Sequence, residues 1–106
     1  MHAIVAGPDP DGIGDALADR GVDVTRVHDI IDRPALEEAG IVDAALYVLT
    51  DVGQATSIPV ACDLTDEIRT VVYARDTVPE FVRGQLDLAL DPRLLEPALV
   101  AEELTG

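Results

Sequence analysis

The sequence predicts an α/β fold in which a five-stranded parallel sheet carries helices on both faces. Five segments have the apolar or alternating pattern of strands, and each is followed by a segment of helical periodicity. This alternation is typical of parallel sheets built with right-handed crossovers. At 106 residues, 48% of them hydrophobic, the chain can bury one core and not two. We therefore expect residues 1–106 to form a single domain.

The first part of the chain predicts two strand–helix units. His2–Ala6 is an apolar strand, and Ile13–Arg20 is a helix whose apolar residues recur three and four positions apart. Gly21 follows as a terminating glycine. Val22–Val27 alternates apolar and polar residues as a strand does, and Arg33–Ala39 is a short helix with a proline at an early position.

The second part predicts three further units. Ala44–Leu49 is a continuous apolar run, which is typical of a strand covered on both faces. Gln54–Leu64 has helical spacing, and Pro59 within it should kink or restart the helix. The remaining expected elements are a strand at Thr70–Ala74, a short helix at Pro79–Arg83, a strand at Leu86–Leu90 and a closing helix that is entered at Asp91-Pro92 and restarted at Pro97.

The charge of the chain excludes several classes of function. Twenty-one acidic residues face seven arginines and no lysine, which gives a net charge of −14. The acids are scattered as a coat, so duplex DNA, RNA and anionic membranes would be repelled. We expect adaptation to molar salt, where screening removes the self-repulsion of the coat. Without lysine there can be no P-loop or Schiff-base site, and with Cys62 as the only cysteine there can be no intramolecular disulfide or cysteine metal cluster.

The sequence also predicts where the protein works. A strand that starts at His2 leaves no room for a signal peptide, and no apolar run approaches the length of a membrane span. We therefore expect a cytoplasmic protein that does not insert into membranes and does not bind nucleic acid.

A binding site in such a sheet lies beyond the carboxyl ends of the strands. The first of these ends carries the loop G-P-D-P-D-G, from Gly7 to Gly12. It matches the first and third glycines of the dinucleotide fingerprint G-x-G-x-x-G, but Asp9 replaces the second. The two prolines of the loop also lack N–H donors, so loss of tight pyrophosphate binding is favoured over retention. Where an acid should bind the ribose, the register places His28, with Asp29 one residue later.

An alternative interpretation uses the acids of the same edge. Asp9, Asp11 and Asp51 could together hold Mg²⁺, because the loops after the first and third strands meet in such folds. This is the arrangement of a receiver domain, with Asp51 as phosphoacceptor and Thr77 after the fourth strand. The lysine that a receiver needs after the fifth strand is replaced by aspartate. A solvated acidic edge without a metal is the simpler alternative.

Four segments together resemble a known family. They are GVDVTRVH (Gly21–His28), ALEEAGIVDAALYVLTD (Ala35–Asp51), RTVVYAR (Arg69–Arg75) and LDLALDP (Leu86–Pro92). Their order and spacing resemble the N-terminal, nucleotide-binding Rossmann-like domain of the TrkA/RCK family, which regulates potassium transport. The chain is also similar to small stand-alone proteins of halophilic archaea, some of them called CTP synthetase. It is too short for that activity, and it lacks the phosphate-binding lysine and the glutaminase cysteine setting.

The resemblance implies a Rossmann-like three-layer fold with strand order 3-2-1-4-5, in one domain of the TrkA N-terminal type. It implies binding of NAD(H) or an adenine nucleotide, dimerisation, and gating of a transporter without catalysis. The residues carried over are Gly7 and Gly12 in the phosphate loop, Asp29 at the ribose, and Thr50, Asp51 and Arg75 at the edge of the pocket. The departures, Asp9 and His28, fall on the two positions that matter most for NAD.

These observations lead to three functional hypotheses. The first is a non-enzymatic nucleotide-sensing or regulatory module with a degenerate site, which acts as a homodimer or on a transport or regulatory protein. The second is a small Mg²⁺-dependent enzyme or phosphoacceptor that uses the acidic edge. The third is a pure protein-interaction module whose pocket is vestigial.

Overall fold

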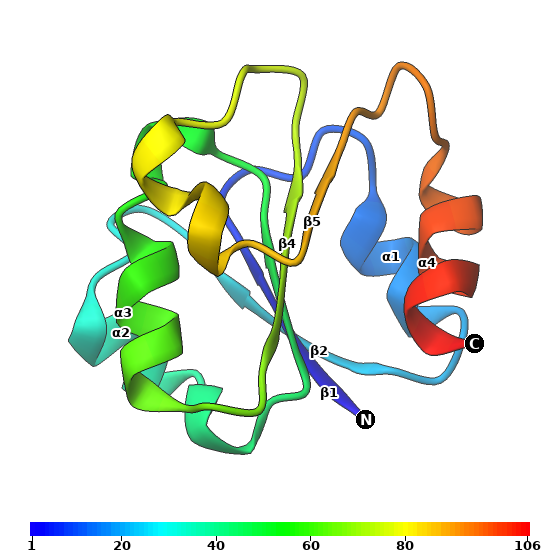
Figure 1. The fold of residues 1–106 in the computed structure, drawn as a ribbon. Coiled ribbons are helices and arrows are strands. Elements are labelled where there is room, and N and C mark those ends of the chain that lie inside the picture. Colours follow the sequence, from blue (N-terminus) through cyan, green and yellow to red (C-terminus); the bar gives the residue numbers. More distant parts are fainter.

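All 106 residues are described in a computed structural model, which shows a parallel sheet between two helical layers (Figure 1). The strands are β1 His2–Ala6, β2 Asp23–Val27, β3 Leu46–Leu49, β4 Arg69–Tyr73 and β5 Leu88–Leu90. The α-helices are α1 Ile13–Ala18, α2 Arg33–Glu38, α3 Ser57–Leu64 and α4 Pro97–Thr105. Three short 3₁₀ helices connect them: η1 Ile41–Asp43, η2 Val52–Gln54 and η3 Glu80–Gln85. The predicted fold class, a five-stranded parallel α/β sheet with helices on both faces, is confirmed.

The order of the strands differs from the prediction. The sheet runs β2-β1-β3-β4-β5, with all neighbours parallel, so the expected order 3-2-1-4-5 is wrong. The reason lies in the side chains of β2 and β3. All four residues of β3 are buried, which suits a central strand, whereas β2 buries only Val27 and exposes Asp23 and Arg26, which suits an edge.

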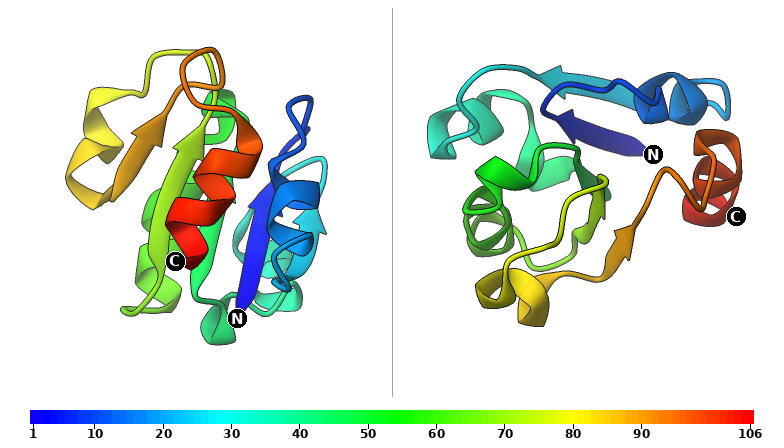
Figure 2. Two further views of the ribbon diagram at one scale, coloured as in Figure 1. Left: turned by 90° about the vertical axis from the view of Figure 1, so that its right-hand side faces the viewer. Right: turned by 90° about the horizontal axis from the view of Figure 1, so that it is seen from above.

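The sheet divides the buried hydrophobic residues of the chain into two layers, one on each face. Helices α1 and α4 cover one face and pack against each other, while α2, α3 and η3 cover the other (Figure 2). Alternate residues of each central strand point into opposite cores. In β1, for example, Ile4 lies in the core under α2 and α3, and Val5 lies in the core under α1 and α4.

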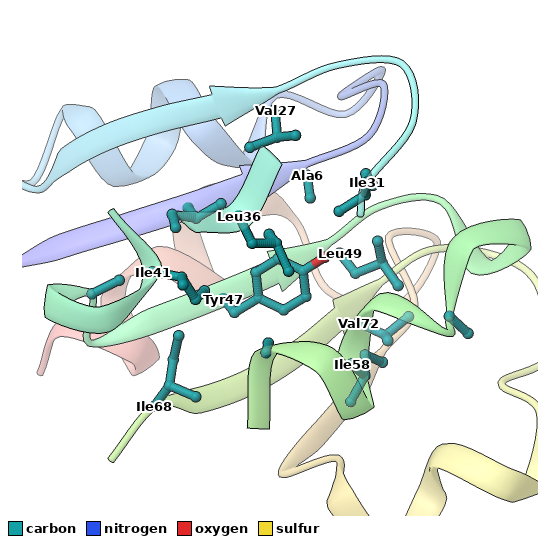
Figure 3. Packing of buried hydrophobic residues seen from close by; sticks show 14 of the residues in the cluster. Ala6, Val27, Ile31, Leu36, Ile41, Tyr47, Leu49, Ile58, Ile68 and Val72 are labelled. Carbon is teal, nitrogen blue, oxygen red and sulfur yellow. The ribbon is translucent and has the colours of Figure 1, made fainter. Parts of the chain in front are cut away.

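The core beneath α2 and α3 is organised around one tyrosine (Figure 3). Tyr47 is fully buried among aliphatic side chains, including Leu36 and Ile58. Its hydroxyl lies 2.6 Å from Oγ of Ser57, which is also buried. This hydrogen bond satisfies both hydroxyl groups in an otherwise apolar layer, and it fixes the start of α3 over β3.

Most predicted elements differ by one or two residues at an end, and three differ further, among them the helix expected at 54–64, which starts at Ser57 as α3. Pro59 is the third residue of α3, and it does not break the helix because the N–H groups of a first helical turn have no helical partner to lose. Residues 80–85 form a 3₁₀ helix in place of the expected α-helical turn at 79–83. The closing helix starts at Pro97, and Asp91 instead holds a turn by accepting hydrogen bonds from the backbone and side chain of Arg93. None of the helices is long and apolar enough to cross a membrane.

Candidate functional site at the carboxyl edge of the sheet

The strand order places the crossover reversal between β1 and β3, which lie side by side although β2 separates them in sequence. In open α/β sheets, this reversal opens a crevice between the loops that follow the two strands. The loop after β1 contains Asp9, and the loop after β3 begins with Thr50 and Asp51. A ligand of this fold would therefore lie between these two loops.

The loop after β1 is closed by one of its own side chains. The carboxylate of Asp9 accepts hydrogen bonds from the backbone N–H groups of Ile13 (2.9 Å) and Gly14 (2.8 Å), at the start of α1. The same carboxylate pairs with Nη1 of Arg26 on β2, at 3.0 Å. Only 7% of the Asp9 side chain is exposed. The N-terminal N–H groups of α1 are thus already occupied by an internal anion and its arginine.

This arrangement sets the charge state of Asp9. Burial of the carboxyl favours its neutral form and raises its pKa, but the hydrogen bonds from Gly14, Arg26 and Ile13 and the charge of Arg26 outweigh burial, so the pKa lies below its ordinary value. The carboxylate stays ionised, and it stands where the phosphate of a bound nucleotide would meet the start of the helix. A second anion at this position would be repelled and would find its donors taken.

Gly7 and Thr50 lock the first loop to the third strand. Gly7 has φ +101°, and a Cβ there would approach Oγ1 of Thr50 to 2.8 Å. The Thr50 hydroxyl lies within hydrogen-bond reach of the carbonyl oxygens of Ala6 (3.1 Å) and Pro8. Gly12 also has a positive φ, +79°, but nothing lies within 4 Å of its Cβ position. The predicted phosphate-loop glycines therefore serve the packing of the loop and its entry into α1.

Asp51 turns away from the crevice. Its carboxylate accepts from the N–H of Gly53 at 3.0 Å and from the side-chain amide of Gln54 at 3.3 Å. Gln54 in turn donates to the carbonyl oxygen of Asp29 at 2.8 Å and accepts from the N–H of Ile31 at 2.7 Å. Gln54 thus ties the loop after β3 to the loop after β2. No sequence pattern pointed to this residue.

The crevice itself is small and acidic. A cavity of about 190 Å³ lies beside the loop after β1, and its charged lining is Asp9, Asp11, Arg75 and Asp76. Arg75 donates from Nη2 to Asp11 at 2.8 Å, which closes one side. Thr50 also lines this cavity, together with Pro10, Tyr73 and Ala74. The structure therefore gathers Asp9, Thr50 and Arg75 of the predicted site residues around one space.

The other predicted site residues lie elsewhere. His28 and Asp29 are exposed in the turn after β2, and neither lines the cavity. Asp29 adopts a left-handed backbone conformation with φ +61°. Asp51 does not join Asp9 and Asp11, and nowhere in the chain do three acidic, histidine or cysteine side chains converge in a way that could hold a metal ion. Arg26, which pairs with Asp9, was not predicted as a site residue. The sequence feature that could have indicated it is a charged residue inside a strand that is otherwise half apolar.

Comparison with known proteins identifies a family. A model of the family of unknown function DUF7126 matches residues 3–104, so the chain belongs to this family. No curated protein sequence matches the chain.

Solved structures with a similar fold include pilus assembly proteins and a response regulator. A Burkholderia thailandensis protein assigned to pilus assembly (CpaE) superposes with a TM-score of 0.70 at 16% identity, covering 99% of this chain and 95% of that one. A pilus assembly-related protein of Burkholderia pseudomallei gives 0.70 at 16% identity, covering 99% and 87%. A response regulator protein of Burkholderia pseudomallei with a phosphorylated aspartic acid gives 0.63 at 18% identity, covering 99% and 71%. At these identities the likeness concerns the fold.

These findings correct the family and the function expected from the sequence. The resemblance to the TrkA/RCK domain is wrong, because the matching family is DUF7126 and the similar structures are response-regulator and pilus assembly proteins. The nucleotide-sensing module linked to potassium transport is wrong with it. The physical reason is visible in the strand order and in Asp9, whose carboxylate fills the anion position that a nucleotide-binding domain leaves open.

Proposed function

We propose that this member of the DUF7126 family is a regulatory domain of response-regulator-like fold that acts by associating with a partner protein. The observation that carries the proposal is the Asp9 carboxylate, bound to the start of α1 and to Arg26. It closes the crevice at which such folds bind ligands. What the domain offers to other molecules is then its outer surface.

The rest of the crevice supports this proposal. The cavity beside the loop holds about 190 Å³, below the usual range for a small-molecule site, and its acids outnumber its single arginine. The acids Asp11 and Asp51 are each engaged by neighbouring donors within the chain. Association with a regulatory protein, or between two copies of the chain, needs no chemistry from these groups.

Phosphorylation is a second candidate function, and one observation favours it. Asp51 is the second residue after β3, at the reversal between β1 and β3, and a similar structure is a response regulator that carries a phosphorylated aspartic acid. Asp11, on the loop after β1, is among the acids that line the crevice. For transfer to occur, Asp51 would have to leave Gly53 and Gln54 and bind Mg²⁺ together with the acids of the first loop.

One experiment separates the two candidates. The purified protein is incubated in molar potassium chloride with Mg²⁺ and acetyl phosphate, and its intact mass and amide NMR spectrum are recorded. We expect no phosphoryl adduct and no change in the amide signals of Gly7, Asp9, Asp11, Gly12 and residues 50–54. An adduct that disappears in Asp51→Asn and persists in Asp43→Asn, which removes an exposed acid of η1, would establish phosphorylation instead.

The association itself is measured separately. Sedimentation velocity reports whether the chain pairs with itself, and cross-linking in the native cells identifies any other partner, which is then purified and titrated with the domain. We expect a saturable complex in one of the two measurements. A chain that stays monomeric and binds no purified partner would contradict the proposal.

A further inference from the structure

A second cavity adjoins the crevice beside Asp9 at the same edge of the sheet and shares three lining residues with it. It holds about 410 Å³ and is formed by the loop after β4, the helix η3 and the loop after β5. Figure 2 shows η3 and β5 together at the rim of the molecule. Its charged lining is Arg75, Asp76, Arg83, Asp91 and Arg93.

The sign of its charge sets this cavity apart. Three of the seven arginines of the chain line it, against two aspartates. In each of the other four cavities the acids equal or outnumber the arginines. A protein of net charge −14 thus concentrates its cations around one space. Among the cavities of the chain, this one therefore suits an anion best.

Each of the three arginines keeps donors that bind nothing in the chain. Arg75 gives one nitrogen to Asp11, and Arg83 lies 3.4 Å from the exposed carboxylate of Glu80 through Nε alone. Arg93 holds Asp91 through Nε and Nη2, which leaves Nη1 free and neutralises that aspartate. Guanidinium groups with free paired N–H donors are well suited to planar carboxylates and to phosphates.

The loop after β4 adds neutral donors to the arginines. Asp76 and Thr77 line the cavity, and their backbone N–H groups make no backbone hydrogen bond. Below them the cavity is apolar, with Val78 buried and Leu86 and Leu90 half-buried. The site therefore has a polar rim that donates hydrogen bonds and an aliphatic floor.

We propose that this cavity binds a small organic anion, whose phosphate or carboxylate group meets the arginines and whose apolar body lies over Val78, Leu86 and Leu90. The Asp76 carboxylate is the only acid of the lining that is not held by an arginine, so it opposes the ligand and limits its affinity. The proposal does not depend on the function proposed above, because the two sites share only Ala74, Arg75 and Asp76.

Phenyl phosphate is a suitable probe, with benzoate as the carboxylate counterpart. Each is titrated into the ¹⁵N-labelled protein and followed by amide NMR, alongside phenol as the apolar body alone and inorganic phosphate as the anion alone. We expect saturable shifts at residues 74–78, 83, 91 and 93, with at least one organic anion binding about tenfold tighter than phenol or inorganic phosphate. Whether phenyl phosphate or benzoate binds tighter identifies the anionic group.

Two variants and one control test the geometry. Arg83→Ala removes an exposed arginine with a single exposed partner, so the fold should survive, and we expect binding to weaken about tenfold. Asp76→Asn should tighten binding by about threefold or more, because it removes the opposing charge. Arg33→Ala also deletes one exposed arginine and its ion pair to Asp63, neither of which lines the cavity, and should leave the affinity unchanged.

The results that would overturn the proposal are equally definite. The first is the absence of saturation by either anion up to about 50 mM, because such an affinity is too weak for a specific site. The second is an equal weakening of anion binding in Arg83→Ala and Arg33→Ala, because that would reflect net charge alone. Shifts confined to the loop at residues 7–14 would place the anion at α1 and would contradict both this inference and the closed state of Asp9.

Discussion

The carboxylate of Asp9 and the guanidinium of Arg26 lie 3.0 Å apart across the loop that joins β1 to α1. Arg26 lies over the first turn of α1 so closely that a Cβ on Gly14 would come within 2.5 Å of it. The chain itself therefore supplies both the anion at the start of α1, which is Asp9, and the counter-ion of that anion, which is Arg26. The Asp9 side chain thus acts as a structural cap on α1.

The first prediction concerns the strength of this cap. Asp9→Asn keeps the size of the side chain but removes its charge and turns one oxygen into a donor that faces the N–H groups of α1. We expect the free energy of unfolding to fall by about 1–3 kcal/mol in urea denaturation, because hydrogen bonds to a charged group are lost. Asp15→Asn is the matched control: Asp15 also contacts Arg26, at 2.9 Å, but it is 85% exposed. Its loss should cost no more than about 0.5 kcal/mol.

The second prediction follows from the lowered pKa of Asp9. The folded state holds this pKa below the ordinary value of 3.8, so the stabilisation by the carboxylate is complete above that value and is lost as the pH falls through the folded pKa. Below about pH 4 the unfolded chain binds the proton first, so stability must decrease as the pH falls. The difference in unfolding free energy between the wild type and Asp9→Asn should be constant from neutral pH down to this region and shrink below it. A difference that grows on acidification would contradict the assignment.

Much of the fold could be predicted from the sequence, because periodicity reports burial. All five strands and their parallel arrangement follow from it. The strand order could also have been obtained, since the polar residues of β2 and the apolar run of β3 distinguish an edge from a centre. The order 3-2-1-4-5, which the resemblance implies, conflicts with this pattern because it places β2 inside the sheet and β3 at its edge. Local pattern was more informative here than likeness to a family.

The site was less predictable for a different reason. The sequence shows that Asp9 is out of place in a phosphate loop, but it does not show that Arg26, seventeen residues away, completes the cap. Similarly, Thr50 and Asp51 are adjacent in sequence, and only the structure shows that Thr50 faces the first loop while Asp51 faces Gln54. The direction in which each of these side chains points depends on tertiary contacts between loops, and loop sequences have no periodicity from which it could be predicted.

The third prediction tests the contact between Gly7 and Thr50. Gly7→Ala would place a Cβ 2.8 Å from Oγ1 of Thr50 on a backbone with φ +101°, so both a clash and backbone strain should appear. We expect a loss of at least about 2 kcal/mol of unfolding free energy. Gly12→Ala provides the comparison, because its φ is also positive but no atom lies within 4 Å. It should lose only about 1 kcal/mol, the cost of the backbone conformation. Equal losses would show that the packing against Thr50 contributes nothing.

The fourth prediction concerns the buried pair of Tyr47 and Ser57. Burial raises the pKa of the Tyr47 hydroxyl above its ordinary value, so the group stays neutral, and it shares a 2.6 Å hydrogen bond with Ser57. Tyr47→Phe or Ser57→Ala leaves the other hydroxyl buried and unpaired, which should cost about 1–2 kcal/mol each. The double variant removes both groups and should cost less than the sum by about 1 kcal/mol. Strict additivity in thermal or urea denaturation would mean that the two hydroxyls do not stabilise each other.

The fifth prediction concerns salt and the acidic coat. With 21 acids against seven arginines, the folded chain concentrates negative charge that the unfolded chain spreads out. Raising potassium chloride from about 0.1 M to about 1 M shortens the screening length from about 10 Å to about 3 Å, so the melting temperature should rise. Glu102 and Glu103 are exposed, make no ion pair and lie near the carboxyl end of α4, where the helix dipole disfavours an anion. The double variant Glu102→Gln/Glu103→Gln should therefore melt higher than the wild type at low salt and approach it at high salt. Glu80→Gln, which removes an acid paired with Arg83, serves as the control and should not raise the melting temperature at low salt.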